Sequence, residues 1–470
     1  MPLRIITDRD ILAAYETDES GLHGHAAGLV RPATAEEVAR LVRRCRKTRT
    51  RLLPVGRRTA TTGAAVPQGD LVLSTEKLTG VVGIDRKSLV AEVLPGTLTA
   101  DVKRAVEAEG LYYPPDPTSE NECTLGGNIA TNASGARSFR WGMTRDWVDG
   151  IEVVLGTGER LTLMQSRPDK NTAGYAPFQD PVSLFLSSEG TLGVITRAWL
   201  RLIPDPGPFV AFLAFFPELS DAFDLAVAFR SRTVQGRPRC VELFDRTALD
   251  ILSQHSRPPA IPAGAQAALF LEFDTLGRPV DRVIDEELGP LERFHVLLDD
   301  TVVADRLQDR TWLRELRHSI PEWLHSQARS CHAQGGLKVS TEFCVPPHHL
   351  HEIMHFVEES ATQAGAHTLL RYGHIGNAHP HVGLLGRNPD EVARMKRLVH
   401  LWYARMAGLG GTVSGEHGIG KTRRDILRHQ YPPMIIRAMR EVKRVLDPDD
   451  ILAIGNIYPE TPAMLPEFFS

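Results

Sequence analysis

One stretch rich in glycine, asparagine and proline, residues 114–142 (PPDPTSENECTLGGNIATNASGARSFRWG), constrains the fold most. It runs for roughly thirty residues without an apolar period, which is too long for an idle connection in a compact domain. Small-residue turns also occur at 54–67 and 187–196, near short strands predicted at 70–74 and 88–96 and a strand, turn and second strand predicted over 151–163. No such turn lies in the G-x-G-x-x-G context of a classical dinucleotide fold. The pattern therefore predicts an α+β domain with an anion site built from separate loops.

Helix signals in the first half have identifiable ends. Residues 32–45 (PATAEEVARLVRRC) carry one apolar stripe behind a capping box formed by Thr34 and Glu37. A second helix, predicted over 98–110, ends at Gly110. Residues 54–67 then combine glycine, alanine and threonine, which permit close backbone approach and offer hydroxyl and amide donors to an anion.

Composition excludes several classes of protein. A net charge of −4 gives no basic field for nucleic acid, and the apolar run 209–216 is too short for a membrane span. The five cysteines form no CxxC pair, which disfavours a disulfide scaffold, a zinc ribbon or an iron–sulfur cluster. The first ten residues lack a basic head followed by an apolar core, so the sequence predicts a cytoplasmic protein.

The second half changes to alternating strands and helices from about residue 206. Apolar runs at 209–216 and 267–274 predict buried strands, and a later set of strands and a helix lies between 338 and 386. This pattern predicts an antiparallel sheet with helices on one face.

Histidines concentrate in RYGHIGNAHPH, residues 371–381. In a strand His379 and His381 would face the same way, and His374 sits across a turn that could fold it back beside them. Spacing alone leaves a metal site and a polar turn as equal alternatives. Glu416 and His417 follow in a glycine-rich segment, and a carboxylate with two imidazoles is the composition of an open, catalytic metal site.

The order of these loops resembles the FAD-linked flavoproteins typified by vanillyl-alcohol oxidase and p-cresol methylhydroxylase, and among them the D-2-hydroxyacid dehydrogenases. The resemblance implies a two-subdomain FAD-binding domain of the p-cresol methylhydroxylase type and a cap domain that supplies the substrate site. It places the FAD-binding domain at 1–205, the cap at 206–410, and a C-terminal segment that returns to the FAD domain at 411–470. It also implies FAD contacts from four loops and a closing turn. These residues are Pro54, Gly56, Arg57, Arg58, Thr59, Ala60, Thr61, Gly63, Pro115, Asp116, Pro117, Thr118, Ser119, Leu125, Gly126, Asn128, Ile129, Asn132, Gly135, Glu189, Gly190, Gly193, Val194, Ile195 and Asn456.

The same resemblance assigns the chemistry. It implies that His374, His381 and Glu416 bind a divalent metal, zinc or manganese, and that His417 is the general base. Arg314 aligns with an arginine that relatives use for the substrate carboxylate, and Glu342 with an acidic residue that orients a histidine. The turn here reads Gly-Asn-Ala-His-Pro instead of the family's Gly-Asp-Gly-Asn, so His379 is a further ligand, a donor to a ligand, or a substrate contact.

Two arginines depart from the family pattern in the first loop. Arg57 and Arg58 replace small residues. They pair with the FAD pyrophosphate, fill part of the groove with their bulk, or point to solvent. That loop holds no histidine or cysteine for a covalent link, so FAD is expected to bind noncovalently.

The implied activity is oxidation of a D-2-hydroxy acid of the lactate, glycolate or 2-hydroxyglutarate class. Electrons would pass to a quinone, a cytochrome or a partner protein. Two alternatives are an FAD-binding subunit of a glycolate oxidase-like complex and a flavin transferase like alkylglycerone-phosphate synthase. The sequence leaves open the oligomeric state, a homodimer included, and peripheral association with a membrane.

Overall fold

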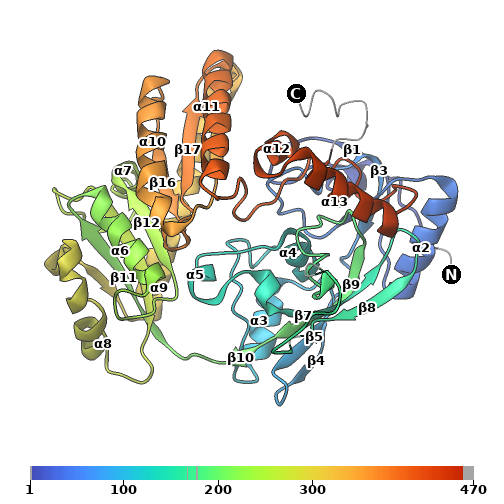
Figure 1. Ribbon diagram of the computed structural model, residues 1–470, viewed down its shortest axis with the longest axis horizontal. Helices are drawn as coiled ribbons and strands as arrows, with labels where there is room; N and C mark the ends of the chain where they lie inside the picture. Colours follow the sequence, from blue (N-terminus) through green and yellow to red (C-terminus); the bar gives the residue numbers. More distant parts are fainter. Residues whose placement is uncertain (1–2, 167, 176–177, 459–470) are drawn as a thin grey trace. The chain divides into compact units, whose positions relative to one another are not determined.

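The computed structural model describes residues 3–166, 168–175 and 178–458, so residues 459–470 of the predicted C-terminal segment lie outside the described part. The described chain forms two compact units (Figure 1). The first takes in the chain up to Gly135, from Gly142 to Asp205, and from Glu416 onward. The second consists of 136–141 and 206–415.

A small parallel sheet opens the first unit, with the strand order β1-β3-β2. Helix α2 packs on it because Val38, Leu41 and Val42 form one buried stripe with Leu52 and Leu73 of the sheet. Thr34 caps this helix by accepting from the Glu37 amide, as the sequence predicts. The elements are α1 (Arg9–Ala13), β1 (His25–Val30), α2 (Ala35–Thr48), β2 (Leu52–Val55) and β3 (Gln68–Ser74).

A five-stranded antiparallel sheet completes the first unit, in the order β4-β5-β9-β7-β8. The C-terminal segment joins the same unit, where Leu452 bridges Leu52 of β2. The elements are β4 (Val81–Asp85), β5 (Val90–Val93), α3 (Thr99–Glu107), β6 (Leu111–Tyr112), α4 (Leu125–Thr131), β7 (Val148–Val154), β8 (Arg160–Met164), β9 (Val194–Arg201), β10 (Ile203–Pro204), α12 (Leu427–Gln430) and α13 (Pro433–Leu446).

Residues 114–142, expected to be one long loop, contain the short helices α4 and α5 (Ser138–Trp141). Thr124 caps α4 by accepting from the Gly127 amide, and Leu125 and Ile129 bury one side of it. This helix has seven residues, too few for its apolar pair to stand out as a helical period.

A seven-stranded sheet forms the second unit, in the order β14-β11-β13-β12-β16-β17-β15, with every neighbouring pair antiparallel. The predicted α+β class with an antiparallel cap sheet is thus confirmed. The elements are β11 (Phe209–Phe216), α6 (Leu219–Ser231), β12 (Val241–Asp245), α7 (Arg246–Leu252), β13 (Ala267–Asp274), α8 (Val280–Glu287), β14 (Val302–Ala304), α9 (Leu307–Cys331), β15 (Leu337–Glu342), α10 (Leu350–Gln363), β16 (Leu370–Gly373), β17 (His381–Gly386) and α11 (Pro389–Gly408).

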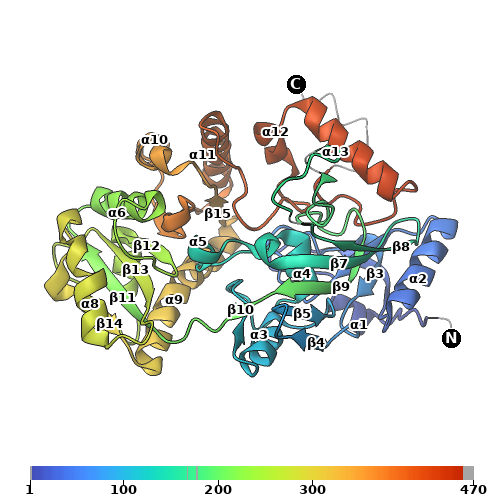
Figure 2. The same cartoon turned by 60° about the horizontal axis from the view of Figure 1, so that its bottom comes forward.

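Helices cover both faces of this sheet, where the sequence predicted helices on one face. Leu213 and Phe215 of β11 pack with apolar residues of α7 and α9. On the other face, Phe229 of α6 contacts Phe273 of β13, which contacts Phe212. Figure 2 shows helix α6 lying over strands β12 and β13 of this sheet. The uninterrupted apolar run FVAFLAFF is the physical reason, because a strand buried on both faces has no polar alternation. No helix in the described ranges is both long and apolar enough to cross a membrane.

Candidate functional site

The small-residue loops predicted to bind FAD converge within the first unit. A Cβ on Gly56 would lie 2.2 Å from Thr124 Oγ1, so the loop after β2 packs directly on the start of α4. The Glu189 amide donates to the carbonyl of Ala130 at 2.9 Å, which ties the 187–195 turn to α4. Asn456 Nδ2 donates to the carbonyls of Ala64 and Glu189, each at 3.0 Å. The first loop, helix α4, the 187–195 turn and Asn456, which are far apart in sequence, therefore lie next to one another in this unit.

The first loop is rich in hydrogen-bond donors that the protein does not use. Within the described chain, none of the backbone amides of residues 57–64 donates to another residue. The hydroxyls of Thr61 and Thr62 are also buried without a partner. Buried polar groups are normally satisfied, so these two hydroxyls, next to a run of unused amides, point to a ligand that accepts hydrogen bonds. The loop fits the pyrophosphate of FAD on these grounds.

The two arginines of this loop lie differently. Arg57 is exposed. The Arg58 guanidinium lies over the Tyr15 ring, 4.4 Å from its centroid, and burial lowers the pKa of Arg58. Neither arginine makes a hydrogen bond to the described residues, so both keep their donors for a ligand or for water.

Several predicted FAD residues have their side chains engaged by protein. Asn128 donates to Thr99 at 2.7 Å, and Asn132 accepts from the Arg145 amide at 2.9 Å. The Glu189 carboxylate accepts from the amides of Ile419 and Gly420 at 2.7 and 2.8 Å. Burial raises the pKa of Glu189 to about 7, although the hydrogen bonds from these two amides lower it.

The rest of that set differs in exposure. Thr118, like Arg57, is exposed, and the others are half-buried or buried. Half-buried are Pro54, Gly56, Arg58, Thr59, Ala60, Thr61, Asp116, Ser119, Gly126 and Gly190; buried are Gly63, Pro115, Pro117, Leu125, Ile129, Gly135, Gly193, Val194 and Ile195.

Three histidines of residues 371–381 gather at the end of β16 and the start of β17. The ring centroids of His374 and His381 are 5.2 Å apart, and His379 lies 5.4 and 5.2 Å from them. Gly373 permits this arrangement, because its φ is +89° and a Cβ there would lie 2.4 Å from the His381 ring. The turn thus folds His374 back beside the strand histidines.

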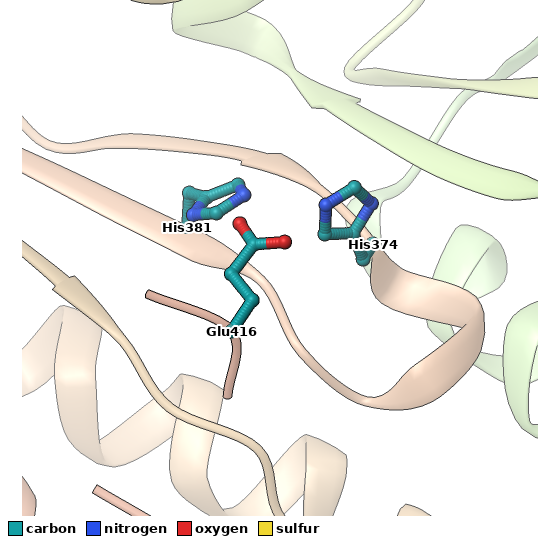
Figure 3. Close-up of side chains that lie close together, drawn as sticks. All are labelled: His374, His381 and Glu416. Atoms are coloured by element: carbon teal, nitrogen blue, oxygen red, sulfur yellow. The ribbon is translucent and has the colours of Figure 1, made fainter. Parts of the chain in front are cut away.

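Glu416 brings a carboxylate to this pair of rings. One ligand atom from each of His374, His381 and Glu416 lies within 4.8 Å of the others, and Figure 3 shows the carboxylate directed toward the two imidazoles. Glu416 directly follows Gly415, whose amide donates to the Glu342 carbonyl at 2.8 Å. This hydrogen bond to the end of strand β15 fixes the position of the backbone just before Glu416. Its Oε2 accepts from Ser134 at 3.2 Å.

His417 and Glu342 lie next to this group. His417 Nε2 is 3.5 Å from Glu416 Oε1, and the His417 side chain is 37% exposed, which leaves it accessible to a small molecule. Glu342 is buried, and it lies opposite His381 in the antiparallel register of strands β15 and β17. Glu342, Glu416 and His417 also have ligand atoms within 4.8 Å of one another.

Sequence reasoning missed two residues of this centre, Glu242 and Arg317. His374 Nδ1 lies 2.6 Å from Glu242 Oε1, and Arg317 Nε donates to Glu242 Oε2 at 2.5 Å. Burial opposes ionisation of Glu242, but Arg317 and His374 outweigh it and lower its pKa to about 2. A glutamate inside the apolar strand VELFD was the available signal, because an acid is rarely fully buried unless it is paired.

The predicted substrate arginine lies elsewhere on helix α9. Arg314 is exposed, whereas Arg317, three residues later, is half-buried against Glu242. The structure brings Arg317 into the hydrogen-bonded chain that ends at His374.

The donor set has a clear chemical meaning. Two imidazoles and one carboxylate suit a divalent ion such as zinc or manganese and leave coordination positions for another molecule. Because His374 Nδ1 faces the Glu242 carboxylate, its proton is held there and Nε2 keeps its lone pair for a metal.

Comparison with known proteins identifies the family of this chain. Residues 26–164 match the family described as FAD binding domain, and residues 206–457 match the FAD linked oxidases, C-terminal domain. The glycolate oxidase subunit GlcD of Bacillus subtilis (strain 168) is 30% identical over 92% of this chain and 88% of its own. The D-2-hydroxyglutarate dehydrogenase of Stutzerimonas stutzeri (strain A1501) is 30% identical over 97% of this chain and 96% of its own.

Solved structures show the same fold at lower identity. The 4-ethylphenol oxidase from Gulosibacter chungangensis aligns with a TM-score of 0.69 at 16% identity, over 97% of this chain and 94% of its own. An alkyldihydroxyacetonephosphate synthase aligns with a TM-score of 0.66 at 19% identity, over 92% of this chain and 76% of its own. The chain belongs to the FAD-linked oxidases, in the branch that includes the D-2-hydroxyacid dehydrogenases.

Proposed function

We propose that this protein binds FAD noncovalently and oxidises a D-2-hydroxy acid to the corresponding 2-oxo acid, with a divalent metal ion in the site. The observation that carries the proposal is the clustering of His374, His381 and Glu416 within 4.8 Å. Relatives of about 30% identity are named for glycolate, D-lactate and D-2-hydroxyglutarate, which supports a small hydroxy acid as the substrate.

Each proposed role follows from what the residue offers. His374, His381 and Glu416 would hold the metal, zinc or manganese. His417 would accept the hydroxyl proton, since a neutral imidazole nitrogen can act as a general base. Bound FAD would supply a hydride acceptor, and the bound metal would orient the acid and lower the pKa of its hydroxyl group.

Two arginines of α9 are candidates for the substrate carboxylate. Arg314 is the one expected from the sequence, and it is an exposed residue of this helix. Arg317 is closer to the chemistry through Glu242 and His374. His379, third member of the histidine cluster, is proposed as a further metal or substrate contact.

Electrons would leave to a quinone, a cytochrome or a partner protein, which keeps open the role of FAD-binding subunit in a glycolate oxidase-like complex. The transferase alternative has less support, because the likeness to alkyldihydroxyacetonephosphate synthase at 19% identity concerns the fold alone. The 1–205, 206–410 and 411–470 division and a cytoplasmic location are also proposed.

Replacement of the metal residues tests the proposal. His374→Ala, His381→Ala and Glu416→Gln should each lose most of the bound zinc or manganese, measured by elemental analysis, together with oxidation of D-2-hydroxy acids by the flavin-loaded protein. His351→Ala is a matched control, since His351 is an exposed histidine of the same unit bonded to Asp224. Full activity in a metal-depleted variant would contradict the metal's role.

A further inference from the structure

The carbonyl groups of the first FAD loop are held by the C-terminal segment of the same unit. The Thr62 carbonyl accepts from the amides of Lys421 and Thr422 at 2.9 and 3.1 Å. The Ala64 carbonyl accepts from Asn456 at 3.0 Å. The protein therefore binds this loop through its carbonyls and leaves its amide groups unused.

Lys421 provides the one charged donor in this set. Its side chain is buried, and its Nζ donates to Asn456 Oδ1 at 2.6 Å and to the Gly63 carbonyl at 3.5 Å. A Cβ on the neighbouring Gly420 would lie 2.2 Å from the Thr62 carbonyl oxygen, so the segment is packed tightly against the loop. Burying an ammonium group costs solvation free energy unless hydrogen bonds and opposite charges compensate for the lost water.

Charged side chains from several segments act on Lys421. Asp70, Glu189 and Asp18 act on its charge from three segments of the unit, and Arg424 opposes them. Burial is nevertheless the largest influence and lowers the pKa of Lys421 to about 8. Lys421 is therefore mostly protonated at neutral pH, where its charge would attract an anion, and it loses that charge at slightly higher pH.

We propose that Lys421 is a positioning residue for FAD: its ammonium holds the Gly63 carbonyl and Asn456, keeps the amide groups of residues 57–64 available to the pyrophosphate, and adds positive charge behind them. The inference rests on the FAD binding stated above and is independent of the metal and of the substrate.

Dissociation of FAD from the purified full-length holoenzyme tests the proposal, followed by flavin fluorescence on dilution at neutral pH. Lys421→Met should raise the Kd of FAD at least about tenfold, the loss expected for a charge-assisted hydrogen bond. Lys103→Met is the matched control, because Lys103 is another buried lysine of this unit that is bonded to Glu120 instead of the loop. That control should change the Kd by no more than about twofold, within ordinary context dependence.

A pH profile separates positioning by charge from simple packing. In the wild type the Kd of FAD should rise as the pH passes about 8, and this step should be absent from Lys421→Met. Burial raises the pKa of Glu189 to about 7, so the profile is repeated in a Glu189→Gln background. A step should remain there but move to lower pH, because the Glu189 carboxylate raises the pKa of Lys421. Lys421→Gln, which keeps a donor but no charge, should also lack the step and serves if the methionine variant does not fold.

The possible outcomes are distinguishable. A wild-type protein that binds no FAD overturns the proposed function itself. A wild type that binds FAD, with Lys421 variants of equal affinity or with the same step near pH 8, overturns only the role of Lys421.

Discussion

Replacing Glu242 by glutamine removes one charge from the core of the candidate metal site. The variant keeps the size of the side chain but has one acceptor oxygen in place of two, so it can accept from His374 Nδ1 or from Arg317 Nε, whereas Glu242 accepts from both. What it loses is the negative charge that Arg317 and His374 both face at 2.5 and 2.6 Å. Glu242→Gln therefore separates the charge of this residue from its shape.

The expected magnitudes follow from burial. The side chains of Glu242 and Arg317 are 1% and 15% exposed, so solvent screens their pairing little. Deleting one partner of a buried pair costs about 3–5 kcal/mol, and because glutamine keeps one of the two hydrogen bonds we expect about 3 kcal/mol of lost stability. Loss of the carboxylate behind a metal-binding histidine typically weakens metal affinity by about 10–100-fold.

Two measurements on one preparation check these values. Chelator competition gives the zinc or manganese dissociation constant, and urea unfolding gives the stability. Glu272→Gln is the matched control, since Glu272 is a buried glutamate of the adjacent strand β13 that pairs with Arg137. The control should lose stability and keep its metal affinity.

One result would refute the reasoning. If Glu242→Gln loses stability as the control does but binds the metal as tightly as the wild type, then the Glu242 carboxylate does not strengthen metal binding by His374.

The remaining predictions concern the two arginines and the buried lysine. Arg317→Ala should raise the KM for the hydroxy acid and lower metal affinity. Arg314→Ala, at an exposed position, should change KM alone or not at all. Steady-state kinetics with bound-metal analysis measures both effects, and a larger metal loss in Arg314→Ala than in Arg317→Ala would contradict the prediction. The folded state lowers the pKa of Lys421 from 10.5 to about 8, so between these values the unfolded chain carries a proton that the folded chain has released. The free energy of unfolding should therefore rise across that window by about 1–3 kcal/mol, and Lys421→Met should lack this rise in urea unfolding below and above it.

Much of the fold was predictable from local patterns. The apolar stripe and cap of α2, the antiparallel cap sheet and the glycine-rich loops all follow from residues close together in sequence. Helix α4 was missed because a short helix carries too little periodicity. Helices on both sheet faces were missed because a wholly apolar strand such as β11 does not say what covers it.

The candidate site divides in the same way. His374 and His381 are close in sequence, so one turn suffices to predict that they meet. Glu242 and Arg317 come from distant elements, and only the pairing of β12 with β16 places Glu242 next to His374. The exposure of Arg314 depends on which face α9 turns to the sheet, which sequence spacing alone does not fix.

The most direct test of the central claim is an anaerobic absorbance titration of the purified, metal-supplemented protein with D- and L-2-hydroxy acids. The account predicts a flavin band that one D-acid bleaches, that its L-enantiomer leaves unchanged, and that no longer bleaches after a chelator removes the metal. A flavin band that no hydroxy acid bleaches, or bleaching that survives complete removal of metal, would contradict it.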